Sequence, residues 1–569
     1  MRVHRGKALV AGLAILALGA AACSSGGGGG SKSSGSGQLI WGEPTAFPGN
    51  LMPIIAAGNS TAVANLQARV LDGAFRVTPQ IAYQPDADQV TSATSSLVNG
   101  QQVVDIKINP KAVWDDGKPI TAADYMFTAS IQKSQDPKTG CPDILGTAGF
   151  DQIQKGVAVG DKEVKFTFLK GKPYADWRGM FGGGTAPIFS KHVMDKGSAA
   201  ADCAYIKKGW PIANGQPPGT SNGPWLLLKK NIDTSKKVVT LVPNPKYWGA
   251  KPKLARLVYA SIGSESDTNV KALKNQEVNI IYPQPQLDLV ANLKQLTGVT
   301  TTVSFGVQFE HLDFNTKDKL LSHLQVRQAI ALAIDRKALV SATVGKFSDK
   351  AQVLDNRIIL NTQTGYEAHG QGYDTQNIAK AKQLLTSLGA KMGKDGYFSL
   401  DGKELSFKVI TTQQNPLRDQ TIQTIAAQVK QAGIKMTEFA DPDIFEDKTH
   451  PNSLEAEGFQ IALFAWVGTP SLSSNNAIYL TKGKGGGQNY SQCSNPQTDK
   501  DLNSLATALN NTSELAYANA ADKTLWDQMC TLPLYQKPTL LSYTNNVTGL
   551  ADNATSAGPL WNSDGFSVK

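Results

Sequence analysis

Residues 101–134 read QQVVDIKINPKAVWDDGKPITAADYMFTASIQKS, which predicts a strand, a turn and the start of a helix in direct succession. Apolar and polar residues alternate in the first part, as in a strand with one buried face: Val104, Ile106 and Ile108. The glycine and proline of DDGKP then predict a turn. A helix is expected to begin at Thr121, with Asp124 as the acidic partner in its cap. This order indicates an α/β fold.

The same alternation continues through the second half of the chain. HLQVRQAIALAIDRKALVSAT, residues 323–343, predicts one amphipathic helix whose apolar residues share a face: Val326, Ile330, Ala333, Ile334 and Leu339. TIQTIAAQVKQAGIKMTEF, residues 421–439, predicts a helix that stops at Gly433 and a strand after it. FQIALFA, residues 459–465, is a short apolar run between two glycines and predicts a strand buried on both sides.

Length and composition indicate a globular protein of two or three domains. The chain has 569 residues, of which 41% are hydrophobic and 18% are charged, so it can bury sizeable cores. Its formal net charge is +9, but Arg2, Arg5 and Lys7 lie in a segment that we expect to be removed. The other basic residues alternate with acids and form no basic stripe. We therefore expect no nucleic-acid partner.

The first 38 residues predict export and a membrane anchor. MRVHRGK is a positive n-region, the apolar run after it is too short to span a bilayer comfortably, and Cys23 follows three alanines. Residues 1–22 resemble a bacterial lipoprotein signal, although Ala20 stands where such signals usually have a larger aliphatic residue. Residues 23–38 predict a flexible Gly/Ser tether. We expect lipidation at Cys23 and a place on the extracytoplasmic face of the cell membrane; a plain secretory signal with a free cysteine is the alternative.

Four cysteines remain when Cys23 is set aside: Cys141, Cys203, Cys493 and Cys530. An even number in an oxidising compartment predicts two disulfides. Of the three connectivities we favour Cys141 with Cys203 and Cys493 with Cys530, because each pair closes a loop of moderate length. The cysteines show no C-x-x-C spacing, and no histidine lies close to a pair of them, so the pattern does not favour zinc. We therefore expect no metal site.

No motif in the sequence requires catalysis. GTSNG, residues 219–223, matches the G-x-S-x-G pattern of a nucleophile elbow, in which the serine lies between a strand and a helix. Here the motif follows a loop and precedes the apolar run PWLLLKK, so Ser221 is expected to be a turn residue. The six histidines are scattered and form no metal-binding pair. We expect a protein that is not an enzyme and has no cofactor.

Seven stretches occur in the order found in one protein family: AVWDDGKPITAADYMFT (112–128), NGPWLLLKK (222–230), LVPNPKYWGAKPKLARLVY (241–259), LDFNTKDKLLSHLQVRQAIALAIDRKALV (312–340), AKQLLTSLGA (381–390), NYSQCSNPQTDKDL (489–502) and LPLYQKPTLLSYTNNVTGL (532–550). From about Leu39 to its end, the chain resembles the extracytoplasmic solute-binding proteins of peptide-type ABC importers. This is the oligopeptide- and dipeptide-binding family, solute-binding protein family 5. Each stretch alone is weak evidence, whereas seven in order are specific.

The resemblance implies a two-lobed periplasmic-binding-protein-like fold of type II, in the peptide-binding class with an extra N-terminal subdomain. Lobe I would comprise residues 39–68, 210–307 and 532–569, subdomain II residues 69–209, and lobe III residues 308–531. A monomer of this family would capture a peptide or modified peptide by lobe closure. It would then deliver the solute to the permease subunits of an ABC importer.

The resemblance also points to the loop after the strand at 459–465 as a ligand site. In the peptide-binding relatives an aspartate of this loop, in a W-x-G-D pattern, pairs with the free ammonium of the peptide. The tryptophan and the glycine are kept here, as Trp466 and Gly468. Where acids are expected, the chain has Thr469, Pro470 and Ser471. Ligand contacts are expected at four further positions: Glu43, Trp177, Trp210 and Gln308.

The missing acid leaves three interpretations open. A buried ammonium without a carboxylate partner costs several kcal/mol, so an acid from elsewhere could approach the same point: Glu43, Asp441, Asp443 or Glu446. Alternatively, the ligand is blocked, cyclic, glycosylated or not a peptide, which suits an indole face and neutral hydroxyls. In the third interpretation, Thr469 and Ser471 only satisfy their own loop.

We therefore predict a lipid-anchored substrate-binding protein of an ABC importer. The alternative from a different class is an envelope-assembly lipoprotein with the same fold that acts in lipoglycan or glycolipid synthesis. A closed, aromatic-lined cleft would favour the receptor. An exposed partner surface would favour the assembly factor.

Overall fold

The structure is a computed structural model that describes residues 37–133, 140–141, 144–182, 186–445 and 449–569. Residues Ser34–Lys569 form one compact unit. The predicted signal segment, Cys23 and most of the tether lie outside the described residues. Within those residues, no helix combines the length and the apolar character needed to cross a membrane.

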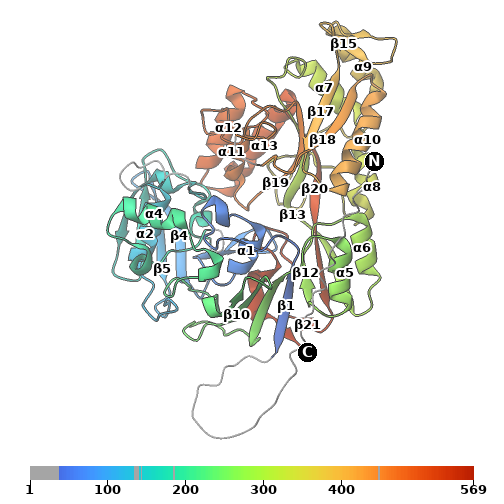
Figure 1. Cartoon of the computed structure of the whole chain (residues 1–569). Helices are drawn as coiled ribbons and strands as arrows, with labels where there is room; N and C mark the ends of the chain where they lie inside the picture. The colour runs from blue at the N-terminus through green and yellow to red at the C-terminus, as the bar shows by residue number, and fades with distance from the viewer. Residues whose placement is uncertain (1–36, 134–139, 142–143, 183–185, 446–448) are drawn as a thin grey trace, which may run out of the picture. The chain divides into compact units, whose positions relative to one another are not determined.

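A mixed sheet of eleven strands dominates the described part of the chain (Figure 1). Ten strands follow one another across the sheet, and β9 (Ile232–Asp233) pairs with β10. In spatial order the ten are β18 (Lys435–Ala440), β17 (Ser406–Thr411), β19 (Ile461–Val467), β13 (Val299–Phe314), β20 (Thr531–Thr544), β12 (Ile280–Ile281), β1 (Gln38–Glu43), β11 (Arg256–Ser261), β10 (Val238–Pro243) and β8 (Trp225–Leu226).

Two long antiparallel strands, β13 and β20, lie in the middle of this sheet. They pair over most of their length, with an irregularity between Phe305 and Phe309. To one side β1 pairs in parallel with β11 and β12, and to the other β17 pairs in parallel with β18 and β19. The long strands therefore join two halves of the sheet, each with parallel pairs of its own.

Helices pack against this sheet (Figure 1). The largest buried cluster combines side chains of β13, β20 and the helices beside them, including Leu312, Ile330, Ile425 and Leu532. The described α-helices are α1 (Thr61–Gln67), α2 (Ala122–Gln132), α3 (Lys191–Met194), α4 (Ala199–Lys208), α5 (Ser266–Lys274), α6 (Leu287–Lys294), α7 (Leu324–Ala333), α8 (Arg336–Ala342), α9 (Ile378–Ser387), α10 (Pro416–Lys430), α11 (Asn476–Tyr479), α12 (Pro496–Thr507) and α13 (Asn511–Gln528).

A second, antiparallel sheet has a hydrophobic core of its own. Its strands lie in the order β4 (Val90–Val98), β5 (Gln101–Ile108), β7 (Glu163–Phe168) and β6 (Ile153–Ala158). Trp114, Tyr125 and Phe166 are buried between this sheet and α2. Shorter sheets are formed by β2 (Phe75–Val77) with β3 (Tyr83–Pro85), by β14 (Lys391–Met392), β15 (Phe398–Leu400) and β16 (Lys403–Glu404), and by β21 (Val547–Thr548) with β22 (Ser567–Val568).

Three predictions that depend on neighbouring residues are confirmed. In β5, the three alternating apolar residues Val104, Ile106 and Ile108 are buried. The helix α2 begins directly after Thr121, whose backbone N–H donates to Asp124 Oδ2 at 2.8 Å. The strand predicted at 459–465 is β19, with four buried residues at its start.

The single helix predicted through Leu339 is wrong, because the chain forms α7 and α8 instead. Ile334 leaves the helix with φ −95° and ψ 123°. Asp335 then caps α8, since its side chain accepts a hydrogen bond from Ala338 N at 2.8 Å. A capping aspartate satisfies a free N–H at a new helix start. This local cap stands where the apolar period alone predicted a continuous helix.

Both favoured disulfides are present. Cys141 is bonded to Cys203 with a Cα–Cα distance of 5.3 Å. Cys493 is bonded to Cys530 with a Cα–Cα distance of 6.3 Å. Each bridge links residues of one contiguous stretch, 62 and 37 positions apart respectively.

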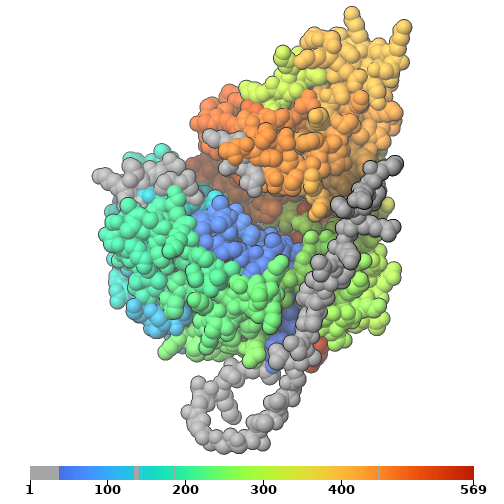
Figure 2. Space-filling view, in the orientation of Figure 1, coloured from blue at the N-terminus to red at the C-terminus, as the bar shows by residue number. Residues whose placement is uncertain are grey.

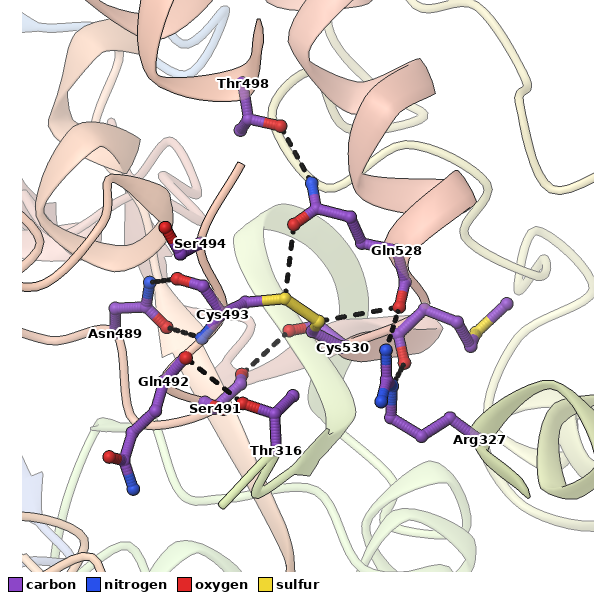
Figure 3. Close-up of a disulfide and its surroundings, with 12 residues drawn as sticks. Thr316, Arg327, Asn489, Ser491, Gln492, Cys493, Ser494, Thr498, Gln528 and Cys530 are labelled. Atoms are coloured by element: carbon purple, nitrogen blue, oxygen red, sulfur yellow. Dashed lines mark hydrogen bonds between the residues drawn. A yellow bond between two sulfur atoms is a disulfide. The ribbon is translucent and has the colours of Figure 1, made fainter. Parts of the chain in front are cut away.

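The Cys493–Cys530 bridge joins the loop before α12 to the junction of α13 and β20 (Figure 3). Beside it, Arg327 of α7 donates to Gln528 O at 2.8 Å and to Met529 O at 3.0 Å. These bonds satisfy carbonyls at the end of α13. Helix, loop and strand are therefore fixed together at one point.

Candidate ligand-binding site

The loop after β19 starts from a fixed point on the central sheet. Trp466 of β19 lies opposite Phe309 of β13 in the antiparallel register. Gly468 N donates to Val307 O at 2.7 Å, which extends this pairing by one bond. The loop then runs into the short 3-10 helix η7 (Leu472–Asn475). Residues 469–471 are therefore held at the end of a rigid strand.

Trp466 is half-buried in an aromatic stack. Its ring lies nearly parallel to those of His311, at a centroid distance of 5.9 Å, and Tyr490, at 5.8 Å. Phe464 meets it edge-on at 5.0 Å. Among the described residues, the indole N–H has no hydrogen-bond partner. The tryptophan is thus firmly oriented and keeps one unused donor.

The hydroxyls of the loop bond within the loop. Ser471 N donates to Thr469 Oγ1 at 3.1 Å, and Ser474 Oγ donates to Ser471 O at 2.7 Å. These contacts fit the interpretation that Thr469 and Ser471 satisfy their own loop. Ser471 Oγ also donates to Tyr83 OH at 3.4 Å, far away in the sequence.

Thr469 and Pro470 also line a cavity of about 80 Å³, which we call the loop cavity. Its walls come from four separate stretches of the chain: Ala64, Ala68, Arg69, Asp72, Phe75, Arg76, Val77 and Tyr83; Gly179, Gly182 and Ala186; Thr469 and Pro470; and Ser556, Ala557 and Trp561. The surface in Figure 2 is also recessed between the blue residues near α1 and the orange residues of the second half. The loop thus meets residues more than 380 positions away.

Ion pairs fill one wall of the loop cavity. The buried Arg69 donates from Nη1 to both oxygens of Asp72 at 2.7 Å and from Nε to Asp564 Oδ1 at 3.0 Å. Burial raises the pKa of the Asp72 carboxyl to about 7, although Arg69 opposes this shift. Arg76 donates from Nε and Nη2 to the two oxygens of Asp86 at 2.5 and 3.0 Å.

A carboxylate does approach the loop, but it comes from a residue that the sequence did not suggest. Asp176 Oδ2 accepts hydrogen bonds from the backbone N–H of Ser473, at 3.0 Å, and from the Ser473 hydroxyl. Burial raises the pKa of Asp176, and the bonds from Ser473 oppose that shift. The carboxylate of Asp176 is therefore already hydrogen-bonded to Ser473 of η7.

Two of the acids considered from the sequence, Glu43 and Asp441, are engaged elsewhere. Glu43 is 1% exposed and accepts hydrogen bonds from three side chains: Trp41 Nε1 at 3.0 Å, Thr45 Oγ1 at 2.7 Å and Asn65 Nδ2 at 3.0 Å. Asp441 accepts from Asp443 N at 2.9 Å and from Asn452 Nδ2 at 2.8 Å. Neither lines the loop cavity. Glu446 lies outside the described residues.

The other expected ligand contacts do not meet at this cavity. Trp177 is 3% exposed in the core of the four-stranded sheet, and Trp210 is 2% exposed in a different core. Gln308 lies on β13 opposite Val467 and is not on the cavity wall. Of the expected ligand contacts in the loop, Thr469 lines the cavity, whereas Trp466, Gly468 and Ser471 are not among its lining residues. Pro470, next to Thr469, lines it as well.

Sequence reasoning missed the charged wall formed by Arg69, Asp72 and Arg76. The signal was present in RVLDGAFRV, residues 69–77, where charges recur within an otherwise apolar stretch. Such charges are rarely buried unless they are paired. Asp564, a partner of Arg69, is 495 positions away, and Asp86, the partner of Arg76, lies outside this stretch, so neither pairing was visible there. The described residues contain no cluster of three or more potential metal ligands among His, Cys, Asp and Glu.

Known proteins resemble this chain over most of its length. The oligopeptide-binding protein OppA of Mycobacterium tuberculosis is 28% identical over 521 residues, which cover 89% of this chain and 82% of OppA. The probable monoacyl phosphatidylinositol tetramannoside-binding protein LpqW of the same species is 23% identical over 452 residues, 74% of this chain and 67% of LpqW. These relatives are binding proteins by name.

A solved structure and a family model agree with this result. The periplasmic EDTA-binding protein EppA matches with a TM-score of 0.84 and 25% identity, covering 94% of this chain and 97% of EppA. The expected two-lobed α/β fold is therefore confirmed. The model of bacterial extracellular solute-binding proteins, family 5 Middle, matches residues 59–489. Because this match spans most of the sequence, the chain belongs to the family 5 extracellular solute-binding proteins of bacteria.

Proposed function

We propose that the protein is a lipid-anchored substrate-binding protein of an ABC importer, which captures an oligopeptide-like or related organic solute by lobe closure. The observation that carries this proposal is the loop cavity, a small space bounded by residues 64–83, 179–186, 469–470 and 556–561. Ligand sites are commonly enclosed between domains. A cavity whose walls come from such distant stretches is what closure of two lobes around a solute would produce.

Hydrogen bonds across this space support a closed arrangement. Tyr83 meets Ser471, and Asp176 meets Ser473. Ala175 N donates to Ala506 O at 3.0 Å. These bonds connect the stretch expected to form subdomain II with the stretch expected to form lobe III. Hydrogen bonds of this kind suit a contact that forms and breaks as solutes enter and leave.

The ligand we propose does not depend on a free ammonium at the loop. The loop itself is neutral, Glu43 and Asp441 are engaged by other groups, and Asp176 is bonded to Ser473. The names of OppA and EppA indicate an oligopeptide and a polycarboxylate respectively. An organic solute with amide and carboxyl groups is compatible with both.

The finer parts of this proposal follow from the N-terminal sequence and the family. Cys23 would carry the lipid anchor, residues 23–38 would act as a tether, and permease subunits would receive the solute from a monomeric receptor. The bounds of the three parts remain a prediction: lobe I at 39–68, 210–307 and 532–569, subdomain II at 69–209, and lobe III at 308–531. The extracellular location is consistent with two disulfides.

The name of LpqW favours a second candidate. That relative is described as a probable binding protein for a mannosylated phosphatidylinositol. A lipoprotein acting in envelope glycolipid synthesis would bind the glycolipid and need no importer. Its headgroup is rich in hydroxyls, which suits the neutral loop with Thr469 and Ser471.

Ligand identification separates the two candidates. The full-length protein is purified under mild conditions and examined by native mass spectrometry for a bound solute. Titration calorimetry then compares free, N-acetylated and glycosylated peptides with a phosphatidylinositol mannoside. A bound peptide or related small solute supports the receptor. Binding of the glycolipid alone would overturn it in favour of envelope assembly.

A further inference from the structure

Arg76 lines the loop cavity and has one guanidinium nitrogen without a hydrogen-bond acceptor among the described residues. Its Nε and Nη2 are held by Asp86, which fixes the plane of the group. Within the described residues, the third nitrogen, Nη1, has no hydrogen-bond acceptor. The side chain is 25% exposed and lines the cavity. A fixed cation with a free donor at a cavity wall is suited to an anionic group.

Arg76 of β2 and Tyr83 of β3 both line the loop cavity, although the register puts their side chains on opposite faces of the β2–β3 hairpin. Val77 lies opposite Tyr83 in the register, and Arg76 is the next residue along β2. Across the cavity, Thr469 adds a second hydroxyl. The neighbourhood of Nη1 thus offers a charge and neutral hydrogen-bonding groups, held by a hairpin on one side and by the end of β19 on the other.

The other charges on the wall do not neutralise this donor. Arg69 has all three nitrogens engaged, by Asp72, Asp564 and Tyr247 OH. Asp72 is the one carboxylate among the described lining residues, and both its oxygens accept from Arg69.

Three acids near the two arginines lie behind the lining residues. Asp86 pairs with Arg76, and Asp564 pairs with Arg69. Asp88 Oδ2 lies 3.7 Å from Arg76 Nη2 and accepts a hydrogen bond from Tyr247 OH at 2.7 Å. None of the three is among the described residues that line the cavity. Arg76, and not these three carboxylates, therefore belongs to the described lining of the cavity.

We propose that the loop cavity takes an acidic group of the solute, a carboxylate at a chain end or on a side chain, and that Arg76 Nη1 donates to it. This inference rests on the proposed function, since it assigns the solute class of the same site. It also gives the site the opposite polarity to the W-x-G-D loop of the peptide-binding relatives. The loop has lost the acid that would attract an ammonium, and an arginine faces it instead.

Matched peptide libraries test this proposal. All members are N-acetylated tri- to pentapeptides; one library ends in a free carboxylate and the other in a carboxamide. A third library, ending in carboxamide, contains glutamate in place of glutamine, so that chain-end and side-chain carboxylates are distinguished. Wild-type protein should retain acid-bearing members at least about tenfold better than neutral ones, which corresponds to one charge-assisted hydrogen bond.

Variants at Arg76 identify the donor. In Arg76→Gln the preference for acid-bearing peptides should fall below about twofold, with carboxamide peptides bound as before. Arg76→Lys keeps the charge but not the planar fork, and should retain part of the preference. Arg256→Gln is the matched control, because Arg256 is exposed on β11. This control should keep the full preference.

A further variant covers the possibility that Arg76→Gln disturbs folding by leaving Asp86 without its partner. Thr469→Asp adds a negative charge to the cavity wall. It should weaken the binding of acid-bearing peptides and leave the binding of carboxamide peptides unchanged. Equal retention of acid and carboxamide members by wild-type protein overturns the inference alone. A preference that survives in Arg76→Gln also overturns it. Retention of neither library, with no bound solute found on purification, contradicts the proposed function itself.

Discussion

Ser473 donates two hydrogen bonds to one carboxylate oxygen of Asp176, although the two residues are 297 positions apart in the sequence. One comes from the backbone N–H, at 3.0 Å, and the other from the hydroxyl. Asp176 directly precedes the 3-10 helix η3 (Trp177–Phe181), and Ser473 lies in η7. This contact ties the stretch expected for subdomain II to the stretch expected for lobe III.

Asp176→Ala should destabilise this closed contact. It removes the acceptor for two donors and leaves the backbone N–H of Ser473 unsatisfied in a buried place, which costs about 1–3 kcal/mol. Asp176→Asn keeps an oxygen acceptor and should cost less. Urea unfolding measures the free energy, and small-angle scattering without ligand should show a more open alanine variant. Unchanged stability and scattering would show that the contact contributes nothing to closure.

Glu514→Gln should stabilise the protein at alkaline pH. Burial raises the pKa of Glu514 on α13 to about 7; Asp176 adds to this shift, while Arg178 opposes it. Since the folded-state pKa lies above that of the unfolded chain, the stability contributed by the protonated group is present below about pH 4.3 and is lost as the pH rises through about 7.

Thermal unfolding checks this prediction between pH 4 and pH 8. The melting temperature of Glu514→Gln should exceed that of the wild type at pH 8 and match it at pH 4. Glu265→Gln, at an exposed position, is the control and should show no such difference. A gain that is independent of pH would point to packing instead of charge.

Cys23→Ser should release the protein from membranes into the medium. The positive n-region, the apolar run and the cysteine together predict lipidation at this residue. Acyl chains contribute roughly 0.8 kcal/mol per buried methylene group, so their loss removes the anchor. Fractionation of producing cells, followed by immunoblotting, measures the shift. Equal membrane retention of the variant would end the lipoprotein prediction.

Removal of the Cys493–Cys530 bridge should destabilise the protein by about 2–5 kcal/mol. The bridge closes a loop of 37 positions and fixes the end of α13, where Arg327 also binds (Figure 3). The double variant Cys493→Ala/Cys530→Ala is compared with wild type by denaturant unfolding. Non-reducing peptide mapping of wild type should find Cys493 joined to Cys530 and Cys141 joined to Cys203. A bridge between the two groups would contradict the assignment.

Trp466→Ala should weaken solute binding by roughly 2 kcal/mol or more, because aromatic anchors dominate binding energies. The ring stacks between His311 and Tyr490, so its removal also leaves a void and lowers stability. Trp466→Phe preserves an aromatic ring, so it should lose less binding free energy and less stability. Calorimetry with wild type should further show N-acetylated peptides bound at least as well as free-amino forms. A strong preference for free-amino forms would mean that an acid pairs with the ammonium after all.

Features set by adjacent residues were predictable. Alternation placed Val104 and Ile106 on the buried face of β5, and the Thr121–Asp124 pair marked the start of α2. Both depend on contacts within a few positions, which sequence period and capping chemistry describe directly. The break at Asp335 was equally local but was missed, since the apolar period continued past the cap. The loop residue Thr469 was proposed as a ligand contact because the family motif fixed its place after Trp466, and it lines the loop cavity.

By itself, the sequence determined the family, the α/β class and the absence of an acid in the loop after β19. Only the tertiary structure decided which charged groups meet that loop. Arg76 and Thr469 line one cavity, and Asp176 bonds to Ser473, because the fold brings together stretches separated by hundreds of residues. The burial and pairing of a charge depend on neighbours distant in sequence, and no local pattern encodes them.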